Sequence, residues 1–156
     1  MTWDLVLPLL VERLKAVDGI GAIHNYLRLT KFWADFFKLN VTSQKAHAWE
    51  VTRLGMDNQI EALNNQQAAS LLYRQSHKVL LIGRMALADA EESELLFQRI
   101  VDRVVRSFEA DVLLGGKLYI AIPPGIESIG HGNYGGVLVH EARVSFVATV
   151  RSSANG

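Results

Sequence analysis

Few residues in this chain have the type and spacing that catalysis or metal binding requires. Gly115-Gly116-Lys117 ends like a phosphate-binding loop, but Leu118 stands where that loop needs Ser or Thr. Glycine commonly ends a helix, so a turn after a helix explains the glycine pair better. His140-Glu141 begins like a zinc-protease motif, but no second histidine follows and the segment alternates like a strand. Neighbouring side chains of a strand point to opposite faces, so these two cannot share a metal ion.

The remaining candidates for chemistry are two histidines and scattered serines. His131 and His140 could meet if the loop that carries His131 lies against the strand that carries His140, but a zinc site needs three or four ligands. Ser93, Ser107 and Ser145 lack the Gly-x-Ser-x-Gly context of a hydrolase nucleophile. The chain has no cysteine, which excludes a disulfide scaffold, a thiolate nucleophile and an iron–sulfur cluster. The sequence therefore predicts no catalytic residue, no cofactor and no metal.

The composition is that of an ordinary globular domain without a charge bias. The 156 residues are 49% hydrophobic, and 16 basic side chains balance 16 acidic ones. This balance removes the simplest argument for binding to nucleic acid or to a membrane surface. Residues 1–10 are apolar, but Asp4 and Pro8 interrupt them and no Lys or Arg precedes them. We therefore expect neither a membrane span nor a signal peptide, and a protein that stays in the cytoplasm where it is made.

One charged stripe could still contact nucleic acid. Arg99, Arg103 and Arg106 are spaced i, i+4 and i+7, so they share one face of a predicted helix. Three arginines in a row can bind phosphates. Asp102 and Glu109 lie close to them, which favours the interpretation that this is a solvated helix face.

An aromatic cluster also has two interpretations. Phe32, Trp33, Phe36 and Phe37 gather in a short amphipathic segment, residues 31–39. They could close the core of a small domain. Alternatively, part of the cluster could anchor a partner, since Trp and Phe are frequent at the energetic centres of interfaces.

Hydrophobic periodicity predicts alternating helices and strands without a linker between domains. The third helix has Asp89 and Glu92 placed as a capping pair, with acidic residues in its first turn. The order of elements favours an α+β domain, one sheet with helices packed on a face, over residues 1–151. The predicted helices are 3–17, 31–39 and 89–108, and the predicted strands are 20–29, 47–54, 77–87, 118–122 and 138–150.

Three segments are predicted to be irregular. Residues 55–76 are polar and read as a long connection, which inside a compact domain is commonly functional. Pro123-Pro124 should stop the preceding strand, and the glycine-rich residues 123–136 should form a second loop. Residues 152–156 read as a flexible C-terminal tail.

Several segments resemble tail terminator (tail-completion) proteins of tailed bacteriophages. The run His47-Ala48-Trp49-Glu50-Val51-Thr52-Arg53 looks like the start of a β-hairpin of that family. Residues 77–83 and 89–97 follow in the same order, and Asn25-Tyr26-Leu27-Arg28 followed by residues 33–37 fits the same pattern. The resemblance covers roughly residues 20 to 151.

The resemblance implies an assembly protein without catalytic residues. Its family has a mainly antiparallel sheet with helices against it and forms a homohexameric ring. The ring caps the tail tube, stops its polymerisation and joins the tail to the head. The implied partners are further copies of this chain, the major tail tube protein and the head-completion or connector protein, while DNA only passes through the lumen and no membrane is involved. The implied location is the host cytoplasm during assembly and then the tail or neck of the virion.

The two predicted loops would supply the contacts of such a ring. The candidate interface residues are Met56, Gln59, Asn64, Ile126 and Tyr134, and the candidate lumen-facing or DNA-facing residues are Arg99, Arg103 and Arg106. A long exposed strand such as residues 138–150 could also contribute a ring interface.

Other functions remain open at this point. Another neck protein, a head-completion protein or stopper, is the nearest alternative. A small DNA- or ligand-binding module using the arginine stripe or the loop around His131 is the alternative from a different class. An enzyme would need a pocket built from His24, His131 or His140, which the sequence gives no reason to expect.

Overall fold

The computed structural model describes residues 3–26, 41–42, 45–61, 72–88, 92–134 and 137–153. The predicted helix 31–39, with its aromatic cluster, lies outside these ranges. The elements are α1 (Trp3–Lys15), β1 (Ala22–His24), β2 (Val41–Thr42), β3 (Lys45–Glu61), β4 (Leu72–Ala86), α3 (Ser93–Ala110), β5 (Ile120–Tyr134) and β6 (Val137–Ser153).

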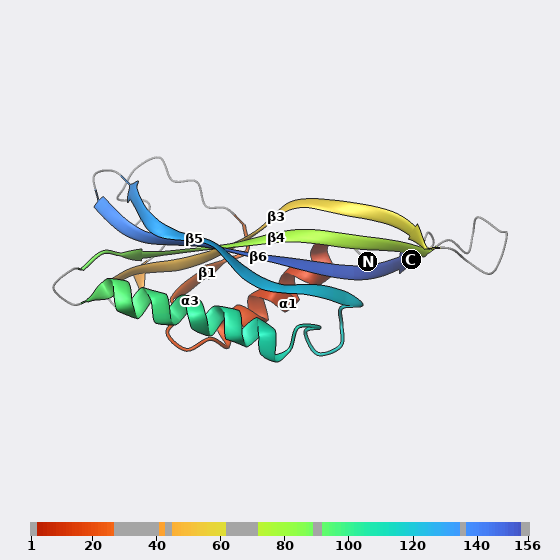
Figure 1. Ribbon diagram of the computed structural model, residues 1–156, viewed down its shortest axis with the longest axis horizontal. Helices are drawn as coiled ribbons and strands as arrows, with labels where there is room; N and C mark the ends of the chain where they lie inside the picture. The colour runs from red at the N-terminus through yellow and green to blue at the C-terminus, as the bar shows by residue number, and fades with distance from the viewer. Residues whose placement is uncertain are drawn as a thin grey trace.

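The strands form one sheet in the order β1-β3-β4-β6-β5, and β2 pairs with β3 beside this path. The long strands are all antiparallel neighbours, and only the short β1 runs parallel to its partner β3. Both α1 and α3 lie on one face of the sheet (Figure 1). The α+β class, the antiparallel sheet and the single layer of helices are therefore confirmed.

The core lies between the two helices and the sheet. Phe108 of α3 packs against Phe146 of β6 with ring centroids 5.3 Å apart. Burying a large apolar side chain of this kind stabilises the fold by roughly 1.5–3 kcal/mol. The central buried residues are Val6, Leu10 and Leu14 of α1; Phe97, Val101, Val104 and Phe108 of α3; and Trp49, Leu81, Val144 and Phe146 of the sheet.

The packing of Trp49 requires a glycine at the facing position of the neighbouring strand. It is fully buried and pairs with Gly83 across β3 and β4. A Cβ atom at Gly83 would lie 2.5 Å from the Trp49 ring, so only glycine leaves room for the indole. The indole Nε1 donates a hydrogen bond of 3.1 Å to Nε2 of His47 on the same strand. The Trp49 side chain is thus held both by packing and by a buried acceptor.

The prediction of a long connection at residues 55–76 is wrong for residues 55–61 and 72–76. Strand β3 continues to Glu61 and β4 begins at Leu72, so most of this segment is a paired hairpin; residues 62–71 lie outside the described ranges. Figure 1 shows the paired strands continuing beyond α1. Strand ends that no described helix covers need no apolar face. Their polar sequence therefore lacks the alternation by which a strand is predicted.

The predicted glycine-rich loop at residues 123–136 is also wrong. Strand β5 runs through the two prolines to Tyr134, with register shifts between Ile122 and Gly125 and between Ile126 and Ser128. Prolines are compatible with this position because β5 is an edge strand and the shift is a bulge. Gly132 is needed because a Cβ there would lie 2.8 Å from the Tyr134 ring.

The long strand predicted at residues 138–150 is confirmed as β6, but it lies between β4 and β5 and offers no free edge. It continues to Ser153, so the prediction of a tail from residue 152 is wrong for residues 152 and 153, and residues 154–156 lie outside the described ranges. From Ala142 to Ala148 burial follows the predicted alternation, with Ala142, Val144, Phe146 and Ala148 buried, whereas Val139 and Thr149 are buried outside it.

The ends of α3 differ from the predicted capping. The helix begins at Ser93, and Glu92 precedes it in a left-handed conformation without a side-chain cap. The predicted pairing of Asp89 with Glu92 is wrong because Glu92 lies before the first turn and not inside it; Asp89 itself lies outside the described residues. The Ser93 hydroxyl instead accepts a hydrogen bond of 2.8 Å from the Ala88 N–H. After the helix, Gly115 and Gly116 have φ angles of 72° and 75°, which confirms the predicted glycine turn.

Candidate functional site

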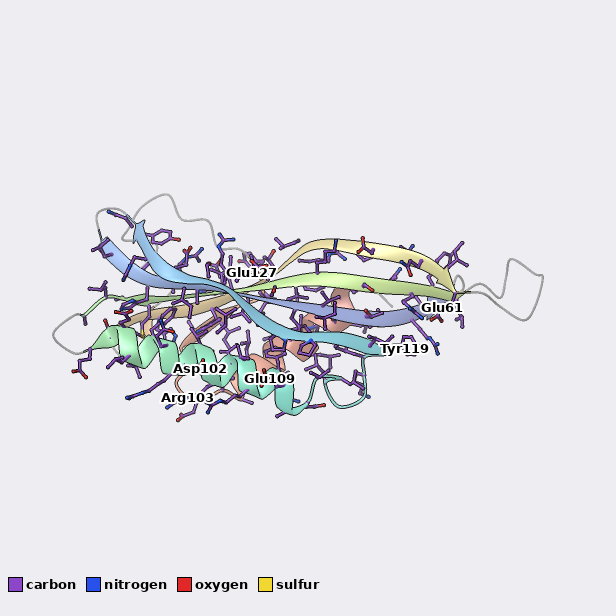
Figure 2. All side chains as sticks on the ribbon, in the orientation of Figure 1. Glu61, Asp102, Arg103, Glu109, Tyr119 and Glu127 are labelled. Carbon is purple, nitrogen blue, oxygen red and sulfur yellow. The ribbon has the colours of Figure 1, made fainter. Side chains whose placement is uncertain are left out.

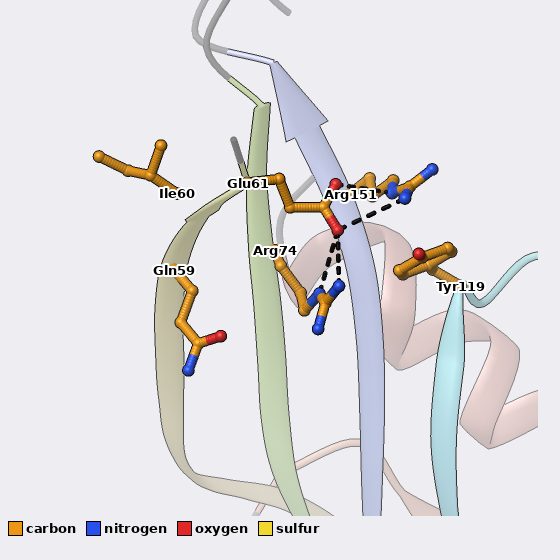
Figure 3. Close-up of a pocket in the computed structure, with 6 residues that line it drawn as sticks. All are labelled: Gln59, Ile60, Glu61, Arg74, Tyr119 and Arg151. Carbon is orange, nitrogen blue, oxygen red and sulfur yellow. Dashed lines mark hydrogen bonds and ion pairs between the residues drawn. The ribbon is translucent and has the colours of Figure 1, made fainter. Parts of the chain in front are cut away.

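A pocket at the end of the sheet gathers charged residues from three strands and the segment before β5. Its volume is about 390 Å³, and its lining residues are Gln59, Ile60 and Glu61 of β3, Arg74 of β4, Arg151 of β6 and Tyr119. We call it the sheet-end pocket (Figure 3). Arg74 pairs with Arg151 in the register, whereas Val150, the residue of β6 before Arg151, lies in the core. The two arginines therefore lie on the face opposite the helices.

Glu61 holds the two arginines of this pocket. Its Oε1 accepts hydrogen bonds from Nε and Nη2 of Arg74 at 3.1 and 2.8 Å. Its Oε2 lies 2.9 Å from Nε of Arg151 (Figure 3). The hydrogen bond from Arg74 is the main reason that the pKa of the Glu61 carboxyl lies below its usual value. The carboxylate therefore stays ionised at neutral pH.

Tyr119 forms the aromatic wall of the sheet-end pocket. Its backbone N–H donates a hydrogen bond of 2.8 Å to the Thr149 carbonyl, which holds it beside β6. The Arg151 guanidinium lies 3.6 Å from the centroid of the Tyr119 ring, and that of Arg74 lies 5.4 Å from it. Arginine over an aromatic face is attracted by the ring's quadrupole.

A second charged cluster crosses the middle of the same sheet face. Nη1 of Arg84 lies 2.9 Å from Glu50, and its Nε lies 2.8 Å from both Glu141 and the Tyr134 hydroxyl. That hydroxyl donates to Glu141. Burial opposes the charge on Arg84, but the attraction of Glu50 and the hydrogen bond to Glu141 outweigh it and raise its pKa. These residues come from β3, β4, β6 and β5, so the cluster ties four strands together.

The far end of β3 and the edge strand β5 both leave apolar side chains in solvent. On the hairpin, Leu54 is 62% exposed and Ile60 is 61% exposed, and on β5 Ile122 is 59% exposed. In the described part of the chain, residues 51–61 of β3 have a strand partner only on the β4 side, and β5 has one only on the β6 side. Unpaired strand edges and exposed apolar groups are features of surfaces that bind other chains.

The predicted interface residues fall into four groups. Met56 and Ile126 are exposed on β3 and β5, and Gln59 lines the sheet-end pocket. Tyr134 belongs to the cluster around Arg84. Asn64 lies outside the described residues.

The arginine stripe of α3 is exposed but is accompanied by acids. Asp102, Arg103 and Glu109 all lie along the outer side of α3 (Figure 2). Nη1 of Arg103 donates a hydrogen bond of 3.3 Å to the Asp18 carbonyl, so one of the three predicted arginines also connects α3 to the turn after α1. Arg99 and Arg106 are exposed on the same helix.

His131 and His140 meet as the sequence suggested, with ring centroids 5.5 Å apart. They line a small pocket of about 230 Å³ with Ser93 and Glu94. His140 is buried, and its Nε2 lies 2.8 Å from the Ser93 hydroxyl, which the Ala88 N–H also contacts. Among the described residues no three His, Cys, Asp or Glu side chains are grouped to hold a metal ion. His140 thus connects the start of α3 to β6.

Sequence reasoning missed the sheet-end pocket except for Gln59. Glu61 and Arg74 fell inside a predicted connection, and Arg151 and Tyr119 lie far from them along the chain. The one signal available was the pair of oppositely charged residues in a segment otherwise rich in Asn and Gln. The pairing register, which brings these residues together, has no signature in the sequence.

Neither the family models nor the curated proteins with which the chain was compared include a match to it. Within the described residues, no helix combines the length and the apolar character needed to cross a lipid bilayer.

Proposed function

We propose that this protein is a structural assembly protein of a tailed bacteriophage, a tail terminator. In this role copies of the chain form a ring that caps the tail tube, stops its polymerisation and joins the tail to the head. The partners are the major tail tube protein and the head-completion or connector protein. The protein would act in the host cytoplasm during assembly and then in the tail or neck of the virion.

The two strand edges that have no partner among the described residues carry this proposal. A closed ring needs two different surfaces on each copy, one that meets the preceding copy and one that meets the next. Residues 51–61 of β3 and strand β5 lie on opposite edges of the sheet, and both carry exposed apolar side chains. The sequence resemblance to tail terminators supports the same function. Another neck protein would use similar edges and is the alternative within this class.

Lysine substitutions on these edges are expected to break the assembly. Ile60→Lys on β3 and Ile122→Lys on β5 each place a charge on an exposed apolar position, which opposes edge-to-edge association. We expect at least about tenfold weaker self-association, equivalent to about 1.4 kcal/mol. Analytical ultracentrifugation over a concentration series measures this change.

The matched control is Leu5→Lys on α1, where the leucine is 55% exposed and lies on neither edge. Circular dichroism should show an unchanged fold in all three variants. If the two edge variants associate as strongly as the control variant, the edges are not the assembly surfaces.

A further inference from the structure

The sheet-end pocket has an unbalanced charge. Arg74 and Arg151 are directly opposite each other on paired strands, an arrangement in which like charges repel. Glu61 lies between them and neutralises one of the two. The pocket therefore keeps one net positive charge from its lining residues, Gln59, Ile60, Glu61, Arg74, Tyr119 and Arg151.

The two guanidinium groups are held in place before any ligand arrives. Glu61 accepts hydrogen bonds from Arg74 and Arg151, and the Tyr119 ring lies under the Arg151 guanidinium at 3.6 Å. Each guanidinium carries five N–H donors, more than a single carboxylate can accept. Fixed donors reduce the conformational entropy that a ligand must overcome.

We propose that the sheet-end pocket binds an acidic side chain of a partner protein. A carboxylate matches a guanidinium through two parallel hydrogen bonds, and its single negative charge matches the one unbalanced positive charge.

The surroundings favour a protein over nucleic acid. Ile60 is 61% exposed at the pocket, and Ile120, next to Tyr119, is 44% exposed. An acidic residue flanked by apolar residues would contact both. Affinity for nucleic acid comes from many phosphate contacts, and here one net charge stands in a chain whose total charge is zero. Gln59, Ile60 and Glu61 of this pocket also belong to the β3 edge, but the binding of a carboxylate by Arg74 and Arg151 does not depend on ring formation.

The probe is a capped tripeptide with glutamate between two leucines, and its matched control has glutamine in place of glutamate. Binding to the full chain is followed at constant ionic strength by NMR, on the Tyr119 ring and the arginine Nε–H signals. We expect the glutamate peptide to shift these signals and to bind at least tenfold more tightly than the glutamine peptide. Equal binding of the two peptides, or no binding, overturns the proposal, as does tighter binding of inorganic phosphate.

Three variants sharpen the test. Arg151→Gln leaves the Arg74–Glu61 pair in place and should weaken binding at least tenfold. Glu61→Gln removes the competing carboxylate and should tighten binding several-fold. Lys78→Gln is the control, because Lys78 is exposed on β4 and pairs with Asp57 outside the pocket. An unchanged affinity for Arg151→Gln, or a loss for Lys78→Gln as large as that for Arg151→Gln, overturns the assignment.

Discussion

Replacing Arg84 with leucine is expected to lower the free energy of unfolding by about 3–5 kcal/mol. The Arg84 side chain is only 14% exposed and pairs with Glu50, whose side chain is 3% exposed. Without the guanidinium, the Glu50 carboxylate would remain buried with its cationic partner gone, and Glu141 would lose its hydrogen bond from Nε. Urea unfolding at pH 7 measures the loss.

Two further variants separate charge from packing. Arg143→Leu is the control, because Arg143 is 45% exposed and its Nε is 4.0 Å from Glu141, so its loss should cost less than about 1 kcal/mol. Adding Glu50→Leu to Arg84→Leu removes the stranded carboxylate and should restore a large part of the stability. If the double variant is as unstable as the sum of the single ones, the two residues are not energetically coupled.

Acidification is expected to destabilise the fold through His47. Burial lowers the pKa of His47 from 6.5 to about 4, and its Nε2 must stay unprotonated to accept the hydrogen bond from Trp49. Below pH 6.5 His47 binds a proton in the unfolded chain but not in the folded chain. The contribution of His47 to the free energy of unfolding is therefore fully present above this pH and falls as the pH approaches 4. From these two pKa values, the loss between pH 7.5 and pH 5 is about 2 kcal/mol.

The variant His47→Gln tests this assignment. A glutamine oxygen can still accept a hydrogen bond from the indole, but the side chain does not titrate. Urea unfolding of both proteins at pH 7.5 and pH 5 should show a smaller loss in the variant. Burial also lowers the pKa of His77 and of His140, so a remaining slope of the same sign is expected. An equal loss in both proteins would assign the acid sensitivity to other groups.

The elements that a sequence predicts well here are those that face the core. Helix α3 and strand β6 bury one face each, so their apolar residues recur at the spacing of a helix and of a strand. The predicted class and the helices on one face of the sheet followed from these patterns.

The two wrong loop predictions concern segments that are held in place by backbone pairing and not by burial of side chains. The polar ends of β3 and β4 and the Gly- and Pro-rich β5 contribute little to the core, so their sequences look like loops. Register then decides which side chains meet. Arg74 and Arg151 belong to one pocket because β4 pairs with β6 in a register that neither strand specifies by its own pattern.

The mass of the purified protein in solution tests the central claim most directly. Light scattering after size exclusion, at several concentrations, should give six times the monomer mass. Alternatively, the protein should be a monomer that forms a ring when tail tubes are added. A protein that stays strictly monomeric and does not bind tail tubes would contradict the terminator function. It would favour the binding module that uses Arg99, Arg103 and Arg106, which predicts salt-sensitive affinity for DNA.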